Sequence, residues 1–421
     1  IRRCPGSHPR AAMEGSEGST NEAEALKKEL EDAKAEIARL KEQLATRDRR
    51  TDVFQSIVEF RESLLDRLDL SSLQQSAQQL QATLRRPVVP RRKRQAFAAA
   101  LPFATLPLAY LLTLALIWIA IFRDPTRLVA AFLVLYFGHI ALDSSSERGS
   151  QPRAWLKGHW MWRHMADYFP VELRKMNPET PFPAEATYLF GYHPHGIISV
   201  GCFVNFATSA TGFPGLFPGL DIRLGTLGFN LKIPFFREWL LRMGIISVSA
   251  PSIRHVLQRG PGAAVVIVPG GAAESLDARP GANDLTLQRR NGFFRIALQH
   301  GVQLVPVYSF GENELYEVPT TARLRWLQET MMRWVGYTMP IYMGAGCAST
   351  AAQATPLNPV PRRHPVITIV GDPIPCERVV DPTQEQIDTL KSRYIERLKE
   401  IFDRFADQYA PSRQGNLRIV S

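Results

Sequence analysis

Cysteine is scarce in this sequence, and its few cysteines lie far apart. The 421 residues include only four, with no Cys-x-x-Cys spacing: Cys4, Cys202, Cys347 and Cys376. This excludes a disulfide-stabilised scaffold and a zinc knuckle, and is typical of a protein that faces the reducing cytosol. The Pro/Gly/Arg-rich opening up to Met13 has no apolar core, so we do not expect it to be a secretory signal. We expect Met13 to be the native start.

Charge is absent from one long segment. Residues 95–122 are twenty-eight positions without Asp, Glu, Lys or Arg, and after a polar break with Pro125, residues 128–142 are again apolar. About 20 helical residues cross a bilayer core of ~30 Å, so the first run is long enough and the second is marginal. A buried hairpin of a soluble protein is the alternative, but so long an uncharged run is unusual for a globular helix. We predict a transmembrane hairpin over 95–142.

Acidic residues are missing just before this segment. Residues 85–94 hold six basic residues and no acid, and they contribute much of the chain's net charge of +10. Basic flanks mark the side that is not translocated, so both ends of the hairpin are expected on the cytosolic side, in contact with anionic lipid. No zinc finger, helix-turn-helix or RNA-binding aromatic pattern accompanies the positive charge, which argues against nucleic acid as a partner.

Residues 1–94 form the first predicted domain, a helical and basic extension. Residues 21–47 carry an apolar stripe at helical spacing among Glu and Lys. This pattern is consistent with a charged surface helix or with a short coil for self-association into a homo-oligomer. A second helical stretch is expected over residues 52–84, as a linker or surface helix.

From about residue 150 the pattern changes to short β-rich runs that alternate with amphipathic helices. This alternation predicts an α/β domain over 150–421, with a largely parallel sheet flanked by helices and an active site just past the carboxyl ends of strands. The expected strands are 186–192, 245–249, 263–268, 303–309 and 366–370. The expected helices are 197–209, 235–243, 252–258, 291–300, 322–335 and 384–408.

The first strand exit carries two histidines, His193 and His195, held on either side of a proline and followed by Gly196. A neutral imidazole suits removal of a proton from an alcohol near pH 7. Gly196 permits a turn and would leave helix N-terminal amides open for an oxyanion or a phosphate. A His-x-His metal site and a purely structural loop are the alternatives. We find no third metal ligand at a suitable spacing, and favour acid/base chemistry.

Two further strand exits supply glycines and polar groups. Gly270 and Gly271 precede Glu274, a carboxylate that could orient a histidine and stabilise its imidazolium. The third exit contains Glu312 and Asn313, two further candidates for substrate binding. The three exits are expected to converge at one edge of the sheet.

These blocks, in this order and spacing, closely resemble the type-2 diacylglycerol acyltransferase family over roughly residues 95–409. The resemblance rests on Asp167 to Pro170, Tyr192 to Gly196, Pro269 to Gly271 with Glu274, Arg290 to Ala297 running on to Gly301, Leu304 to Pro306, Phe310 to Asn313, and Val370 to Ile374. It does not explain residues 1–84.

The resemblance implies an integral enzyme of the endoplasmic reticulum and lipid droplet, with residues 150–421 as a cytosol-facing acyltransferase domain. Such an enzyme moves a fatty acyl group from acyl-CoA to diacylglycerol, making triacylglycerol. Membrane lipid is an implied partner, and no cofactor is implied, although a role for a divalent ion stays open. Monoacylglycerol or a long-chain alcohol as acceptor, and a non-catalytic lipid-droplet scaffold, are the alternatives. No serine or cysteine nucleophile with a base is apparent, which favours direct attack on the thioester.

The resemblance also bears on the roles of single residues. More distant glycerolipid acyltransferases place an aspartate five positions after the catalytic histidine, where this chain has Ile198 or Val200. The orienting carboxylate must therefore come from elsewhere, with Glu274 the first choice and Glu312 the second. We favour His195 as the base and His193 as its support. For the CoA phosphates the candidates are Arg289, Arg290 and Arg295, near a helix start.

Overall fold

The computed structural model describes residues 91–316 and 361–420, together with a few isolated positions and two short strands between them. The chain divides into two compact units, Ile1–Val88 and Val89–Ser421. The helices predicted over 21–47, 52–84 and 322–335 lie outside the described residues apart from isolated positions, as do residues 85–90 of the basic run, whereas residues 91–94 begin a helix. The second unit contains every residue predicted for the site.

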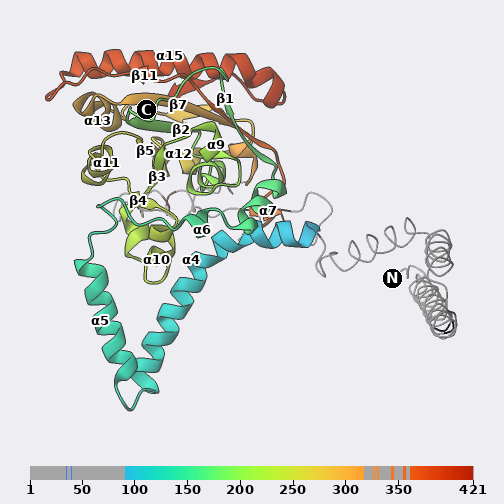
Figure 1. Cartoon of the computed structure of the whole chain (residues 1–421), viewed down its shortest axis with the longest axis vertical. Helices are drawn as coiled ribbons and strands as arrows, with labels where there is room; N and C mark the ends of the chain where they lie inside the picture. Colours follow the sequence, from blue (N-terminus) through green and yellow to red (C-terminus); the bar gives the residue numbers. More distant parts are fainter. Residues whose placement is uncertain are drawn as a thin grey trace, which may run out of the picture. The chain divides into compact units, whose positions relative to one another are not determined.

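A mostly parallel sheet forms the centre of this unit (Figure 1). Five neighbouring strands, β7, β2, β5, β3 and β4, run parallel. β10 lies antiparallel against β7, and β1 pairs parallel with β10. The strands, in sheet order, are β1 (Val171–Lys175), β10 (Val366–Val370), β7 (Gln303–Phe310), β2 (Tyr188–His193), β5 (Ala263–Ile267), β3 (Asp221–Thr226) and β4 (Ile245–Ser247), with β11 (Ile374–Pro375) also on β7.

Helices cover both faces of the sheet, so the sheet is buried on both sides. Alternation along β2 shows this directly, because Phe190 and Tyr192 belong to one apolar core and Leu189, the neighbour of Phe190, belongs to the other. The helices that bury their apolar faces in the second core are α11 (Ala250–Leu257), α13 (Gly292–His300) and α15 (Gln384–Tyr409). The first core takes side chains from α7 (Trp160–Tyr168), α8 (Val200–Cys202), η2 (Phe203–Ala207), α9 (Phe213–Leu216), η3 (Gly228–Lys232) and α10 (Phe236–Arg242).

Shorter elements complete the described part of the chain. They are α6 (Ala154–Lys157), α12 (Gly271–Asp277), η4 (Glu312–Glu314), β6 (Asp284–Thr286) paired with β12 (Arg418–Val420), and β8 (Met343–Ala345) paired with β9 (Ala354–Pro356).

The expected fold class is confirmed for the α/β part: a mostly parallel sheet is flanked by helices, and the five predicted strands are present. The other strands were not predicted: β1, β3, β6, β8, β9, β11 and β12. β1 is a sheet edge of alternating polar residues, and β3 opens with Asp221 and carries the buried Arg223, so neither reads as an apolar run.

The predicted helix over 197–209 is wrong at its start. The chain turns at Gly196 (φ 58°) and again at Ser199 (φ 52°), both in the left-handed region, so α8 begins only at Val200. A short π-helical segment, η2, follows directly. Such segments interrupt regular helices and are often found near functional sites.

The apolar segment forms two helices that contact each other, α4 (Arg91–Phe122) and α5 (Leu128–Leu142). Early in α4, Gln95, Ala98 and Ala99 are buried, and this helix contacts α7. Residues Ala104–Phe122 are the one stretch in the described part of the chain that is long and apolar enough to cross a membrane, and α5 is shorter. The first turns of α4 therefore belong to the packing of the α/β part.

A buried ion network ties α5 to α10. The guanidinium of Arg237, almost fully buried, pairs with Asp143 just after α5 and with Glu238 at 3.1 Å, and its Nε donates to the carbonyl of Leu231 at 3.0 Å. Tyr136 of α5 donates to the other oxygen of Glu238 at 2.6 Å. Two carboxylates thus depend on a single buried cation.

We predict that Arg237→Ala lowers the free energy of unfolding by about 3 kcal/mol, because it leaves both carboxylates without their counter-charge. Arg242→Ala, an exposed arginine of the same helix, is the matched control and should change stability by no more than about 0.5 kcal/mol. The measurement is chemical unfolding of the purified full chain in detergent. Equal stability of the two variants would contradict the prediction.

Candidate active site

The loop after β2 lies at the centre of the candidate site. β2 is buried along its whole length between β5 and β7, and it ends at His193. A cis peptide bond joins His193 to Pro194. His193 is fully buried, whereas His195 is only partly buried. Of the two predicted histidines, His195 is therefore the one that solvent reaches.

His193 is held by a tyrosine from the last helix. The hydroxyl of Tyr394 in α15 donates to the carbonyl of Gly191 at 3.0 Å and lies 3.0 Å from Nε2 of His193. A hydroxyl has a single proton, so Nε2 must be the donor in the second bond, which leaves Nδ1 unprotonated. Burial lowers the pKa of His193 to about 3. His193 is thus a neutral, fixed ring, which fits its predicted supporting role.

Gly191 makes room for this contact. A Cβ atom at this position would lie 2.1 Å from the Tyr394 hydroxyl oxygen. Any larger residue would push the hydroxyl away from both the carbonyl and the imidazole.

His195 presents a free basic nitrogen. Its Nδ1 lies 3.1 Å from the carbonyl oxygen of Gly196, which can only accept, so Nδ1 carries the proton and Nε2 carries the lone pair. Burial lowers the pKa of His195 to about 4, so the ring is neutral at pH 7. A neutral imidazole with an unprotonated Nε2 is the state that a general base requires.

Glu274 contacts the loop differently from what we expected. One carboxylate oxygen accepts the backbone N–H of His195, and the other accepts that of Thr286 at 2.8 Å. The expected pair between Glu274 and an imidazole is therefore not formed: Glu274 binds main-chain donors, and the ring of His195 is hydrogen-bonded to the carbonyl of Gly196. The carbonyl of Gly196 orients the ring instead. Burial raises the pKa of Glu274 to about 7.

The two glycines before Glu274 fit this contact. A Cβ atom on Gly270 would lie 2.2 Å from a Glu274 carboxylate oxygen, and Gly271 has a φ of 60°. The glycine pair thus lets the backbone turn tightly around its own carboxylate.

Glu312 holds the other end of the loop. It follows β7, and its Oε2 accepts the Tyr192 hydroxyl at 2.7 Å and the backbone N–H of Gly201 at 2.9 Å. Burial raises the pKa of Glu312 to about 7. The prediction of open helix amides after Gly196 is wrong at this point, since helix α8 starts later and the carboxylate occupies its first turn. A Cβ atom on Gly196 would come within 2.7 Å of Glu312.

The remaining predicted residues lie at the neighbouring strand exits. Arg290 donates to the carbonyl of Gly270 at 3.0 Å and so links the loop before α13 to the Gly270 turn. Arg289 and Arg295 are exposed, the latter on the first turn of α13. Asn313 donates to the carbonyl of Ala282 at 2.8 Å.

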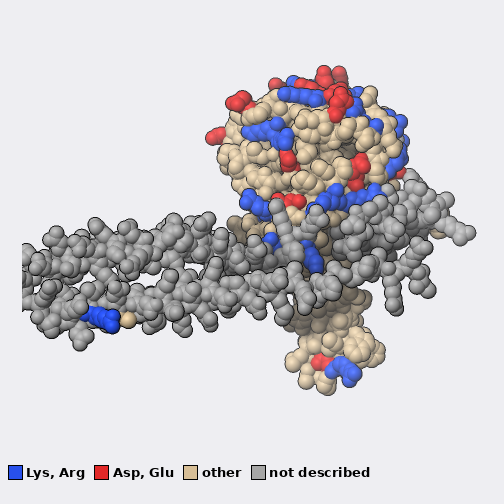
Figure 2. Space-filling model, turned by 90° about the vertical axis from the view of Figure 1, so that its right-hand side faces the viewer, with Lys and Arg blue, Asp and Glu red and all other residues tan. Residues whose placement is uncertain are grey.

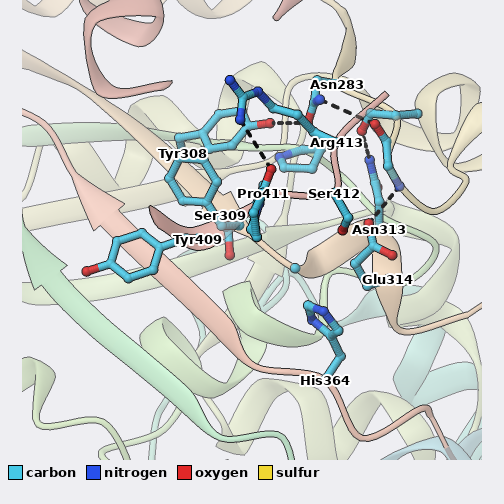
Figure 3. Close-up of a pocket in the computed structure, with 16 residues that line it drawn as sticks. Asn283, Tyr308, Ser309, Asn313, Glu314, His364, Tyr409, Pro411, Ser412 and Arg413 are labelled. Atoms are coloured by element: carbon cyan, nitrogen blue, oxygen red, sulfur yellow. Dashed lines mark hydrogen bonds between the residues drawn. The ribbon is translucent and has the colours of Figure 1, made fainter. Parts of the chain in front are cut away.

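A cavity of about 150 Å³ with a mixed polar and apolar lining lies beside the loop, and Pro194 forms part of its wall (Figure 3). Its polar side chains are partly paired: Tyr308 donates to Asn283 at 3.1 Å and Glu314 accepts the backbone N–H of Gly281 at 2.6 Å. Oδ1 of Asn313, by contrast, is buried without a hydrogen-bond partner among the described residues. Residues 409–413, at the end of α15 and just after it, form another wall. His364 lines this cavity, but neither His193 nor His195 does, so the cavity does not include the basic nitrogen of His195.

Within residues 91–316 and 361–420, no group of three or more His, Cys, Asp or Glu side chains is arranged to hold a metal ion. Sequence reasoning missed Tyr394 as a partner of His193. In the sequence it is one of several buried apolar or aromatic positions along an amphipathic helix, and nothing there distinguishes it from a core residue.

Comparison with known proteins identifies the family of this chain. A family model described as diacylglycerol acyltransferase matches residues 121–420. Diacylglycerol O-acyltransferase 2B of Umbelopsis ramanniana is 37% identical over 330 residues, covering 77% of this chain and 89% of that protein. Human acyl-CoA wax alcohol acyltransferase 1 is 39% identical over 288 residues, covering 68% of this chain and 85% of that protein.

Among solved structures, the 1-acyl-sn-glycerophosphate acyltransferase of Thermotoga maritima gives a TM-score of 0.34 at 11% identity, covering 76% of this chain and 99% of that one, too remote to bear on the site. The family match spans most of the chain and includes the exits of β2, β5 and β7. The chain therefore belongs to the diacylglycerol acyltransferase family.

Proposed function

We propose that this protein transfers a fatty acyl group from acyl-CoA to the free hydroxyl of diacylglycerol, with triacylglycerol and CoA as products. The observation that carries the proposal is the state of His195: a neutral ring with Nδ1–H bound to a carbonyl and Nε2 unprotonated, at the carboxyl end of a central strand. An alcohol acceptor needs such a base, and family membership supplies the substrate class.

The reaction proceeds by direct attack. Nε2 of His195 takes the hydroxyl proton as the hydroxyl oxygen attacks the thioester carbonyl carbon. The tetrahedral oxyanion then collapses, the carbon–sulfur bond breaks, and the leaving CoA sulfur takes the proton back from the imidazolium. The backbone N–H of Gly196, next to the base, is our candidate donor to the oxyanion. Glu274 and Glu312 are positioning residues, because they hold the loop and do not reach the reacting atoms.

CoA carries phosphates, and the exposed guanidinium of Arg295 beside the α13 N-terminus suits them. Arg290 contributes a second guanidinium from the same turn, although one of its N–H groups is already bound to Gly270. Arg290 is connected to the His195 loop, because it binds the carbonyl of Gly270 and the nearby Glu274 binds the backbone N–H of His195. Arg295 follows on the first turn of α13.

The proposed location is the endoplasmic-reticulum membrane, with lipid droplets as a second site. Ala104–Phe122 is the first span and α5 the second, with both ends and the α/β part on the cytosolic side. Diacylglycerol would then reach the site from the bilayer in which the two helices lie. The domain division proposed from the sequence, with a basic extension before the hairpin, stays part of this proposal.

A second acceptor class is favoured by one observation. The human relative at 39% identity is named a wax alcohol acyltransferase, so closely similar chains carry different acceptor names. A long-chain alcohol or monoacylglycerol presents the same hydroxyl to His195. The proposed mechanism is the same for these acceptors.

The direct test uses microsomes from a host without triacylglycerol synthesis, supplied with labelled oleoyl-CoA. The wild type should make triacylglycerol, and His195→Ala should lose at least about 100-fold of the rate, because the base is removed. His255→Ala, an exposed histidine of α11, is the matched control and should stay active. Activity in His195→Ala equal to that of the wild type would contradict the assignment of His195 as the base.

The same microsomes, given diacylglycerol, monoacylglycerol and a long-chain alcohol in competition, identify the acceptor by product chromatography. Triacylglycerol should dominate. A predominance of wax ester or diacylglycerol as product would replace the proposed acceptor.

Tyr394→Phe tests the positioning of His193. The ring keeps its packing but loses both hydrogen bonds, so Nε2–H of His193 is left without a partner in a buried site. We expect kcat to fall about tenfold with KM unchanged, the rate equivalent of roughly 1.4 kcal/mol. Tyr188→Phe, which removes a hydroxyl bound to the Pro183 carbonyl, is the control and should leave kcat unchanged. Similar kcat values for the two variants would argue against the role.

Glu312→Gln tests the buried carboxylate through the pH dependence of stability. The pKa of Glu312 is about 7 in the folded chain against 4.5 for a free glutamate, so the folded state holds its proton more tightly. This contribution to stability is complete below pH 4.5 and is lost as the pH rises toward 7. We expect the Tm of Glu312→Gln in detergent to vary less than that of the wild type over this range. Parallel curves would contradict the shift.

A further inference from the structure

Two tryptophans on the α/β part are exposed to an unusual degree. Trp155 is 68% exposed and Trp160 is 62% exposed, although neither belongs to α4 or α5. Trp162, only two residues further along, is 2% exposed and packs in the first core. The segment 153–163, which comprises α6 and the start of α7, is thus amphipathic, with indole rings on its outer side.

This segment lies where α4 leaves the α/β part. α7 contacts α4, and the ring of Trp160 meets His164 edge-on, with centroids 5.3 Å apart. Nε2 of His164 in turn lies 3.3 Å from the Arg94 guanidinium near the start of α4. Further along α4, the candidate membrane span begins at Ala104. The exposed rings therefore lie close to the level at which the chain would enter a bilayer.

The charge of the segment has one sign. Arg153 and Arg163 are exposed, neither makes an ion pair among the residues that the structure describes, and the segment 153–163 contains no acidic residue. Figure 2 shows Lys and Arg side chains gathered on the side of the α/β part that lies nearest α4 and α5. Tryptophan beside arginine is the composition that favours the boundary between lipid headgroups and acyl chains.

We propose that the segment 153–163 docks the α/β part onto an anionic lipid surface, with Trp155 and Trp160 at the level of the headgroups and Arg153 and Arg163 bound to lipid phosphates and carboxylates. The proposal rests on the proposed membrane hairpin, which brings the segment to the bilayer. Docking holds the α/β part against the leaflet that contains the acceptor, an orientation that a hairpin tether alone does not fix.

The experiment uses the full chain reconstituted into phosphatidylcholine vesicles with or without phosphatidylserine. Cys4 and Cys347 are replaced by Ser, while Cys202 and Cys376 are buried and are kept. An environment-sensitive fluorophore is attached at Trp155→Cys or Trp160→Cys. Ser392→Cys on the exposed side of α15 is the water-facing control, and Leu114→Cys on α4 is the bilayer control.

We expect the labels at 155 and 160 to be quenched by headgroup spin-labelled lipid and shielded from aqueous iodide, with the reverse at 392. Iodide access at 155 and 160 equal to that at 392 overturns the proposal. Arg153→Glu with Arg163→Glu should abolish any gain in shielding from phosphatidylserine. If shielding from iodide depends neither on phosphatidylserine nor on these two substitutions, the proposed binding of anionic lipid by Arg153 and Arg163 is overturned.

The proposed hairpin and the proposed reaction are each tested by a measurement of their own. A label at 114 that iodide reaches shows that the hairpin does not insert, whatever the labels at 155 and 160 report. Triacylglycerol synthesis, measured in the same vesicles with unlabelled chain, reports on the proposed reaction independently of all four labels.

Discussion

Two buried carboxylates hold the loop after β2 by its main chain, and the position of His195 depends on them. Glu274 comes from the exit of β5 and Glu312 from the exit of β7, the two strands that flank β2 in the sheet. Their burial disfavours the charged form, and N–H and O–H donors offset part of that cost. Because parallel neighbours end at the same edge, only this strand order brings both groups to one loop.

The glycines of the site follow from the same contacts. Gly196, Gly201 and Gly270 each lie so close to the side chain of one of the two glutamates that a Cβ atom would fall within 2.7 Å of it. Two of the motifs that carry the family resemblance, Tyr192 to Gly196 and Pro269 to Gly271, thus lie against Glu274 or Glu312 in this chain. At these three positions the main chain passes so close to a glutamate side chain that a residue larger than glycine would not fit.

Much of the sheet could be predicted, because its central strands are short runs of apolar residues between turns. β3 could not be predicted, because Asp221 and Arg223, which form an ion pair, interrupt the run of apolar residues that marks a buried strand. The sequence also placed Glu274 and Glu312 at exits that do meet the histidine loop. It could not tell whether a carboxylate would bind a ring or an amide, because that depends on the left-handed turns at Gly196 and Ser199.

Tyr394 stands 201 positions after the histidine it contacts, in the last long helix of the chain's described part. A growing chain therefore exposes all the motif residues of the loop well before it has synthesised the hydroxyl that fixes the ring of His193. The site is completed only when α15 packs onto the sheet. A protein truncated before this helix would keep every glycine, histidine and glutamate of the site, yet would lack a working geometry.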